Sequence, residues 1–474
     1  MQLSLSDLTD YHQLMARVLG ISRAMRESAA LRRAFASEKE LLMKMLIKNT
    51  LVGGFALALI ANSFVAIANA QDTIADWNAI AETVVKTAGH APPVAALDFA
   101  IVHLAIYDAV QSVEHGHHPY HAVTHHQSGS AKAAAAKAGH DILVGLFPSQ
   151  SDSLDTNYTN YLAENGIDPF DPATEAGARA ASNVLTLRAN DGRFPPNPPP
   201  FLGSDTVGQW RPTASLLPGA PPSFAPGLTP WVANVTPFTM KSTSQFRVGP
   251  PPSLASQVWL RDYDEIKDIG SLFSSTRTPD QTEIGYFWAD SGPVMWQSAL
   301  RDISRSYLHD IGTTARMYAL ADTALADAQI ACWDSKYFYN FWRPITAIRL
   351  GDQDGNTGTD ADPDWQPLIN TPNFPEYPSG HSTTSAAIAH VLRLFFGRDQ
   401  LKFHMTTTNP HAQQKTHTFT RFSQAEEDVV KARVYVGIHY RNTDNVSRIQ
   451  GHKVADWTFE HFCRPFGEPR CETR

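Results

Sequence analysis

The sequence predicts an all-α protein of helical bundles with a long proline-rich connection. Apolar residues recur at helical spacing on both sides of residues 194–252, and no segment shows the sustained alternation of a β-strand. Proline and glycine dominate residues 194–252, which argues against a regular helix there because proline lacks an N–H group and clashes with the preceding turn. We therefore expect an N-terminal bundle over residues 71–193 and a C-terminal bundle over residues 253–474.

The expected elements follow in chain order. In the N-terminal bundle, helical spacing predicts helices within residues 76–113, 131–147 and 172–189. Four aromatic residues indicate that the connection packs on the helical body: Trp210, Trp231, Phe238 and Phe246. Helical periodicity returns after Ser253 and is strongest over residues 281–288, 306–349, 382–396 and 424–437.

The charge balance limits the partners. The 474 residues include 47 acidic and 39 basic residues, which gives a formal net charge of −8. This argues against a general nucleic-acid or anionic-membrane binder, because such partners require a basic surface. Any anion site must therefore be a local concentration of arginine and lysine.

The N-terminal region has the order of a secretory signal over residues 43–70. Two lysines precede an apolar stretch at residues 51–67, which ends in an Ala-x-Ala site closing at Ala70. Cleavage there would export the mature chain to the periplasm or the medium, whereas an uncleaved signal anchor is the alternative. Residues 1–42 are charged and precede this signal, so we interpret them as a non-native or additional extension. We expect no later segment to be apolar and long enough to span a membrane.

The cysteines and the remaining histidines show no zinc-type spacing. Cys463 and Cys471 lie close in sequence, and an exported protein could bridge them, whereas Cys332 is expected to be a buried, inert thiol. The histidines within residues 115–126 could bind a divalent metal, but we favour a solvated loop because no carboxylate or cysteine pattern supports such a site. We expect His390 to pack within the bundle.

Three segments carry chemistry, and the first is K-Y-F-Y-N-F-W-R-P, from Lys336 to Pro344. Seven residues are nearly two helical turns, so Lys336 and Arg343 would share one face of a helix, about 10 Å apart. The segment is otherwise aromatic, and two buried cations are costly unless an anion lies between their charged ends. The alternative is that both side chains extend to the surface.

The second segment is F-P-E-Y-P-S-G-H, residues 374–381, which leads directly into an alanine-rich helix. The N-terminus of a helix offers unpaired N–H groups and the positive end of the helix dipole to an anion. Ser379 can add a hydroxyl group, and Gly380 allows a close approach of the backbone. An ordinary helix cap is the alternative interpretation.

The third segment runs from Arg433 to Asp444 and contains His439. On an unbroken helix, Arg433 and His439 would point about 120° apart. If both face one site, the helix must end or kink between them, and Gly437 is the natural place.

In this order the segments resemble the signature of the superfamily of vanadium haloperoxidases and type 2 phosphatidic acid phosphatases: K-x6-R-P, P-S-G-H and S-R-x5-H-x3-D. The first two blocks match in full. In the third, Ala432 replaces the serine and Thr443 occupies the aspartate position, with Asp444 one place beyond. This departure leaves open whether Asp444 orients the histidine. The resemblance covers roughly residues 76–457 and is greatest to the soluble bacterial haloperoxidase-like branch.

The resemblance implies a role for each matching residue. A bound vanadate, or a phosphate in the same site, would have as equatorial donors Lys336, Arg343, Ser379, Gly380 and Arg433. His439 would be the apical ligand of vanadium, or the nucleophile in a phosphatase, and His381 would act as acid–base on the opposite side. Asp290 and Asp444 would support this cradle from outside, Asp290 as the partner of Arg433. No haem, flavin or nicotinamide is expected.

The motif alone does not separate a peroxidase from a phosphatase, because vanadate and the phosphoryl-transfer transition state share a shape. A haloperoxidase would use hydrogen peroxide to oxidise chloride or bromide to a hypohalous species that attacks a small organic acceptor. A soluble exported acid phosphatase would cleave a phosphomonoester through a phosphohistidine. Trp333 and Phe374 resemble the aromatic halide-pocket residues of chloroperoxidase-type members and favour the peroxidase, although core packing would also explain them. A non-catalytic oxyanion-binding protein or a metal-free acid–base homologue is the third reading, and a homodimer is compatible with the sequence.

Overall fold

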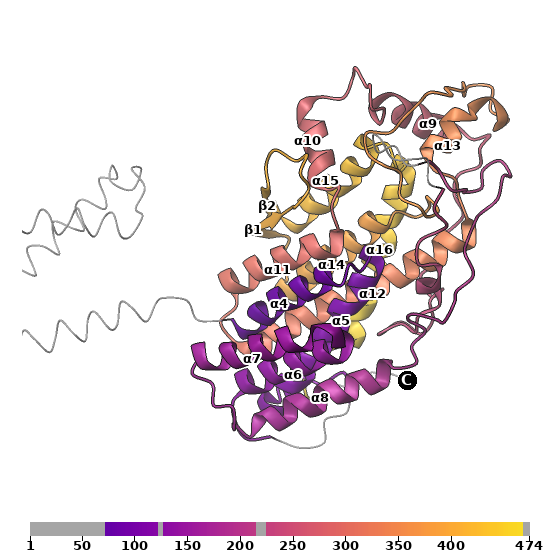
Figure 1. Cartoon of the computed structure of the whole chain (residues 1–474). Coiled ribbons are helices and arrows are strands. Elements are labelled where there is room, and N and C mark those ends of the chain that lie inside the picture. Colours follow the sequence, from indigo (N-terminus) through magenta and orange to yellow (C-terminus); the bar gives the residue numbers. More distant parts are fainter. Residues whose placement is uncertain (1–71, 122–126, 215–223, 468–474) are drawn as a thin grey trace, which may run out of the picture. The chain divides into compact units, whose positions relative to one another are not determined.

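Helices make up nearly all the regular structure in the computed structural model, which describes residues 72–121, 127–214 and 224–467 (Figure 1). This confirms the predicted all-α class. The described residues also contain a two-stranded antiparallel sheet, β1 (Gln400–Thr406) and β2 (Thr416–Arg421), which the sequence analysis did not predict. Leu401, Phe403 and Met405 are buried at alternate positions of β1, a pattern too short to stand out between helices.

The helices before the proline-rich connection are α4 (Thr73–Thr87), α5 (Pro92–Glu114), α6 (Ala131–Leu146), α7 (Ser151–Glu164) and α8 (Ala173–Arg188), with the 3-10 turn η2 (Pro148–Gln150). Helix α4 begins where the carboxylate of Asp72 accepts two backbone N–H groups of the first turn. Helix α5 is long and apolar enough to span a membrane by length and composition, with a mean hydropathy of 1.5, contrary to our expectation. Its apolar window is wholly buried inside the protein, as in the core helix of a bundle.

The described part of the connection contains no α-helix and only the 3-10 turn η3 (Pro230–Asn234). It is fixed to the body by Asp327, whose buried carboxylate accepts the backbone N–H groups of Phe238, Thr239 and Met240. Trp210 is buried as well. The division of the chain into two bundles joined by this connection stays a prediction.

The helices after the connection are α9 (Gln257–Ile269), α10 (Pro279–Phe287), α11 (Gly292–Tyr307), α12 (Ile311–Tyr339), α13 (Pro344–Arg349), α14 (Gly380–Phe396), α15 (Phe422–Tyr435) and α16 (Arg441–His461), with the 3-10 turn η4 (Gly351–Gln353). The helical stretch predicted over residues 306–349 is therefore interrupted twice. The long α12 packs against α5, α14 and α16, and β1 lies beside α11 (Figure 1).

Two apolar clusters support the loops between these helices. The larger contains buried side chains of both α5 and α12, and extends to α14 and α15. The smaller consists mainly of aromatic residues and joins α9 and α13 to the segments before α14 and α16; its centre includes Trp259, Trp342, Tyr377 and Tyr440. Because the first two chemical segments run through these clusters, their backbones are held by packing on several sides.

Candidate functional site

The second and third segments meet at one cavity of about 230 Å³. Lys336, Arg343 and Ser379 do not line it, but Arg343 contacts two lining residues, Phe374 and His439. Six of the predicted site residues line it: Trp333, Phe374, Gly380, His381, Arg433 and His439. They come from α12, α14, α15 and the loops that precede α14 and α16. Tertiary folding therefore brings the second and third segments together beside Trp333 of α12.

Lys336 and Arg343 are both fully buried, but they do not share one helix. Helix α12 ends at Tyr339 because Asn340 adopts the left-handed conformation, with φ +51°. Arg343 is extended, with φ −81° and ψ 155°, as expected for a residue that precedes proline. The prediction of a common helical face was therefore wrong, since the bend after α12 aims the arginine.

The ammonium group of Lys336 donates to the backbone carbonyls of Pro375, Glu376 and Pro378. An ammonium group has three donors, so all three are engaged by the loop before α14. Burial lowers the pKa of Lys336 to about 7. Lys336 thus holds this loop in place, and direct donation to an oxyanion would require one of these bonds to break.

Arg343 and Arg433 retain free donors. The Nε of Arg343 donates to the Phe374 carbonyl at 2.9 Å and its Nη1 to the Ile438 carbonyl at 2.8 Å. The Nη1 of Arg433 donates to the Trp288 carbonyl at 2.8 Å. Arg343 Nη2 and Arg433 Nε are buried and have no hydrogen-bond partner among the described residues. A bound oxyanion would supply these missing acceptors, so the residues present fit phosphate or vanadate.

The P-S-G-H turn opens α14 as expected. Ser379 is the N-cap residue, and Gly380 is the first helical residue. A Cβ added at Gly380 would lie 3.1 Å from Cζ3 of Trp333, so glycine is needed where the helix end meets the aromatic wall. The first N–H groups of a helix have no intrahelical acceptor, which makes this end suitable for an anion.

His381 faces a backbone carbonyl on one side. Its Nε2 lies 2.8 Å from the carbonyl oxygen of Asp290, and a carbonyl only accepts, so Nε2 carries the proton and Nδ1 keeps its lone pair. Burial and the nearby Arg433 lower the pKa of His381 to about 3. The ring is thus neutral near pH 7, with its lone pair on Nδ1, and burial together with Arg433 opposes its protonation.

The carboxylate of Asp290 accepts hydrogen bonds from Ser291, Thr407 and Thr408. The expectation that it pairs with Arg433 was therefore wrong: Asp290 contributes its backbone carbonyl to His381, and Trp288 supplies the carbonyl that Arg433 contacts. Thr407 and Thr408, in the loop after β1, donate to this carboxylate in place of Arg433. The sequence could not show that this loop lies beside Asp290.

His439 reaches the cavity because the preceding helix breaks as predicted. Helix α15 ends at Tyr435, and Gly437 has φ +79°. His439 is buried, with Nδ1 2.8 Å from Oε1 of Glu376 and Nε2 3.2 Å from Nη1 of Arg343. Burial and the neighbouring arginines hold the pKa of His439 well below its usual value.

The sequence analysis missed two residues of the site, Glu376 and Gln329. Glu376 contacts His439, whereas Asp444 accepts a hydrogen bond from the hydroxyl group of Ser382. The available signal was a single acid inside the F-P-E-Y-P-S-G-H block. Gln329 of α12 also lines the cavity, and its buried Nε2 has no partner among the described residues.

The comparisons with known proteins agree with this geometry. Residues 316–468 match the family model described as the second helical-bundle domain of VCPO. The vanadium chloroperoxidase of Curvularia inaequalis is 25% identical over 383 residues, which cover 64% of this chain and 61% of that enzyme. A bacterial vanadium-dependent iodoperoxidase structure has a TM-score of 0.69 at 25% identity, covering 82% of this chain and 95% of that one.

These similarities relate the chain to the superfamily of vanadium haloperoxidases and type 2 phosphatidic acid phosphatases.

Structures of a bacterial vanadium-dependent chloroperoxidase, in apo and holo forms, share the fold with a TM-score of 0.63 at 19% identity. Each comparison covers 78% of this chain and 92% of that chain.

Other predicted sites of the chain gain no support from the described residues. No group of three or more histidine, cysteine or acidic side chains there could hold a metal ion. Cys332 is buried, as expected, and burial raises the pKa of its thiol. Cys471 lies outside the described residues, so its bridge to Cys463 stays a prediction. His390 is mostly buried, as expected: its ring stacks on that of His452 of α16 with centroids 4.4 Å apart, and its Nε2 lies 2.7 Å from Asp456.

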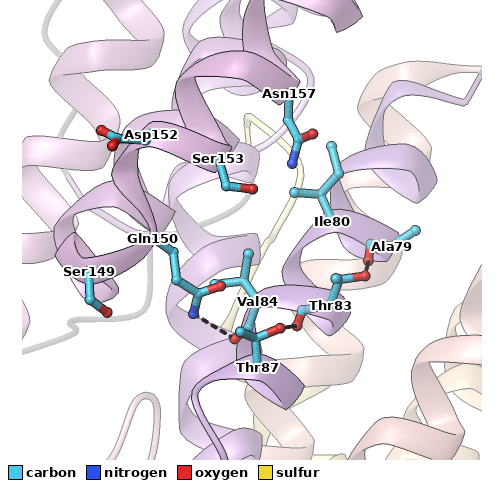
Figure 2. A pocket seen from close by; sticks show the side chains of 10 residues that line it. All are labelled: Ala79, Ile80, Thr83, Val84, Thr87, Ser149, Gln150, Asp152, Ser153 and Asn157. Carbon is cyan, nitrogen blue, oxygen red and sulfur yellow. Dashed lines mark hydrogen bonds between the residues drawn. The ribbon is translucent and has the colours of Figure 1, made fainter.

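A larger hollow of about 650 Å³ lies between α4 and the start of α7 (Figure 2). None of its lining residues is a predicted site residue. Gln150 donates to the carbonyl of Val84, and the threonines of α4 donate to carbonyls of their own helix (Figure 2). Because the lining of this hollow contains no arginine, lysine or histidine to bind an oxyanion, we place the candidate site at the smaller cavity.

Proposed function

We propose that this protein is a vanadate-dependent haloperoxidase that uses hydrogen peroxide to oxidise chloride or bromide to a hypohalous species. The observation that carries the proposal is the composition of the cavity wall. The rings of Trp333 and Phe374 lie 5.0 Å apart, and they line the same cavity as His381, His439 and Arg433. An apolar wall beside cationic donors would strip water from a halide while keeping its charge compensated.

The donor set of this cavity suits a tetrahedral oxyanion. Arg343 Nη2, Arg433 Nε and the first N–H groups of α14 would contact its oxygens. The Nε2 lone pair of His439 accepts a hydrogen bond from Arg343 Nη1 at 3.2 Å, and it would be available to hold vanadate once this bond is released. Bound vanadate would act as a Lewis acid that activates peroxide without a change in its own oxidation state.

The protein's own groups would then handle protons and water. His381 is neutral, and its Nδ1 would accept a proton from peroxide once a bound anion offsets the field of Arg433 that opposes protonation. Phe374 is held from two sides, because Lys336 Nζ lies 5.1 Å and Arg343 Cζ 4.8 Å from its ring centroid. These contacts would hold the aromatic wall in place and so help to keep water from the bound halide.

The test is halide-dependent oxidation of a phenolic indicator by hydrogen peroxide, with chloride, bromide and iodide compared. Metal-free protein is assayed before and after addition of orthovanadate. We expect activity only with vanadate and halide together, and suppression by phosphate, which would compete for the same donors. Hydrolysis of a phosphomonoester without any halide oxidation would replace the proposal with the phosphatase reading.

We also propose that the chain is exported after cleavage near Ala70, a segment that lies outside the described residues. The support is the order of two lysines, an apolar stretch and an Ala-x-Ala site. N-terminal sequencing of protein recovered outside the cytoplasm should give a chain that starts at Gln71. A chain that keeps residues 51–70 would indicate a membrane anchor instead.

A further inference from the structure

The structure assigns to Glu376 the role of orienting His439, in place of the aspartate that the superfamily signature carries at position 443. This inference deepens the proposed function and rests on it, because it takes His439 as the apical ligand. Glu376 is a positioning residue in this scheme, since its carboxylate contacts the histidine and not the oxyanion.

Both carboxylate oxygens of Glu376 have hydrogen-bond partners. The side chain is fully buried, with Oε1 2.8 Å from Nδ1 of His439 and 3.2 Å from the backbone N–H of Tyr440. Oε2 accepts the hydroxyl group of Thr443 at 3.0 Å. Thr443 occupies the aspartate position of the signature. In this chain its hydroxyl group donates to Glu376, which supplies the carboxylate instead.

The hydrogen-bond chemistry defines the tautomer of His439. Arg343 Nη1 lies 3.2 Å from Nε2, and a guanidinium group only donates, so Nε2 must carry the lone pair. The proton is then on Nδ1, which donates to Oε1 of Glu376. This assignment holds whether or not Oε2 is protonated, because a proton there would face the Thr443 hydroxyl. A neutral ring with its lone pair on Nε2 is the form that ligates a metal.

The backbone of Glu376 is fixed as well. Its N–H group donates to the Phe341 carbonyl at 2.9 Å, and its own carbonyl accepts Lys336 Nζ at 2.9 Å. Burial raises the pKa of Glu376 to about 8, whereas the buried cations Arg343 and Lys336 favour its charged form. Glu376 is therefore fixed through backbone, side chain and charge, as a group that orients a ligand must be.

Asp444, the alternative acid, is bonded elsewhere. Its Oδ1 accepts the hydroxyl group of Ser382 at 2.7 Å, on α14. No hydrogen bond joins it to His439 among the described contacts. Asp444 thus supports the helix that carries His381, and the displaced position of this acid does not weaken the orientation of His439.

The experiment replaces Glu376 and then restores the signature arrangement. Glu376→Ala should allow His439 to populate the other tautomer, seen by ¹⁵N NMR of histidine-labelled, oxyanion-free protein, with His439→Ala used for assignment. Its vanadate affinity, measured by calorimetry, should fall roughly 10- to 100-fold. Glu376→Gln keeps an acceptor for Nδ1–H and should retain the native tautomer. The double variant Glu376→Ala with Thr443→Asp should regain part of the lost affinity and the native tautomer.

The matched control is Glu426→Ala. Glu426 is a buried acid 2.8 Å from Nε2 of His452, so the variant also breaks a carboxylate–histidine pair, but on α15 and α16. It should leave the His439 tautomer and the vanadate affinity unchanged. If Glu376→Ala keeps the native tautomer and the native vanadate affinity, Glu376 does not orient His439. If the double variant recovers neither, Glu376 does not take the role that the signature gives to an aspartate at position 443. Both readouts need neither halide nor peroxide, so they stand apart from a failure of the haloperoxidase assay.

Discussion

Removing the guanidinium group of Arg343 tests the oxyanion pocket most directly. Arg343 is fully buried, and its Nη2 is a buried donor without a hydrogen-bond partner among the described residues. A hydrogen bond to a charged group contributes about 1.5–3 kcal/mol, and about 1.4 kcal/mol is a tenfold change in Kd. We therefore expect Arg343→Ala to weaken phosphate and vanadate binding roughly 10- to 150-fold.

The same change also affects folding, because Arg343 donates to the carbonyls of Phe374 and Ile438. Arg277→Ala is the matched control. The Nη1 of Arg277 donates to the carbonyls of Ile269 and Ser271, both at 2.7 Å. Unlike Arg343, Arg277 has no hydrogen bond, among the described contacts, to a residue that lines the cavity. Both variants should lose stability, but only the Arg343 variant should lose affinity.

The assay is isothermal titration of each purified variant with phosphate and with orthovanadate, alongside thermal unfolding. Arg343→Lys keeps the charge but not the planar fork, so its affinity should lie between those of the parent and Arg343→Ala. A folded Arg343→Ala protein that binds both anions as tightly as the parent would refute the assignment of Arg343 to the pocket.

Four further outcomes are expected. His439→Ala should lower vanadate-dependent turnover at least about 100-fold in a protein that still unfolds cooperatively, and full activity would contradict its apical role. Phosphate binding should raise the pKa of His381 from about 3, because an anion offsets the cationic field that opposes its protonation. An NMR titration of His381 with and without phosphate checks this. At any pH between the two pKa values, His381 should be protonated in a larger fraction of the phosphate-bound protein than of the free protein. Gly380→Ala should weaken phosphate binding, since the new methyl group would lie 3.1 Å from the Trp333 ring, and unchanged affinity would show that the wall can move. Gly437→Ala should destabilise the fold by at least about 1–3 kcal/mol in urea unfolding, because φ is +79° and the Cβ would meet a backbone oxygen at 2.3 Å.

The sequence alone determined the features that depend on local spacing. Helical periodicity predicted the all-α class, and the P-S-G-H turn was correctly placed at the start of a helix. The need to end a helix between Arg433 and His439 pointed to Gly437, which has the expected positive φ. These predictions succeeded because backbone sterics and helical repeat act over a few residues.

Sequence-based predictions failed for side-chain partners and elements that depend on residues distant in the sequence, and for the conformation of Arg343. Arg343 was placed on the helix of Lys336, although the residue before Pro344 could have been recognised as extended. Asp290 was given the wrong partner, because the loop after β1 reaches it from more than 100 residues away. The β-strands escaped notice because two short alternating segments gain their stability only by pairing with each other.

Tertiary structure alone decided which acid orients His439. Glu376 and His439 are separated by 63 residues, and their contact depends on the bend after α12, the anchoring of the loop by Lys336 and the break at Gly437. The sequence supplied the donors of the pocket, since each sits within a recognisable block. It could not supply their hydrogen-bond partners, because a buried polar group bonds to whatever packing brings within about 3 Å.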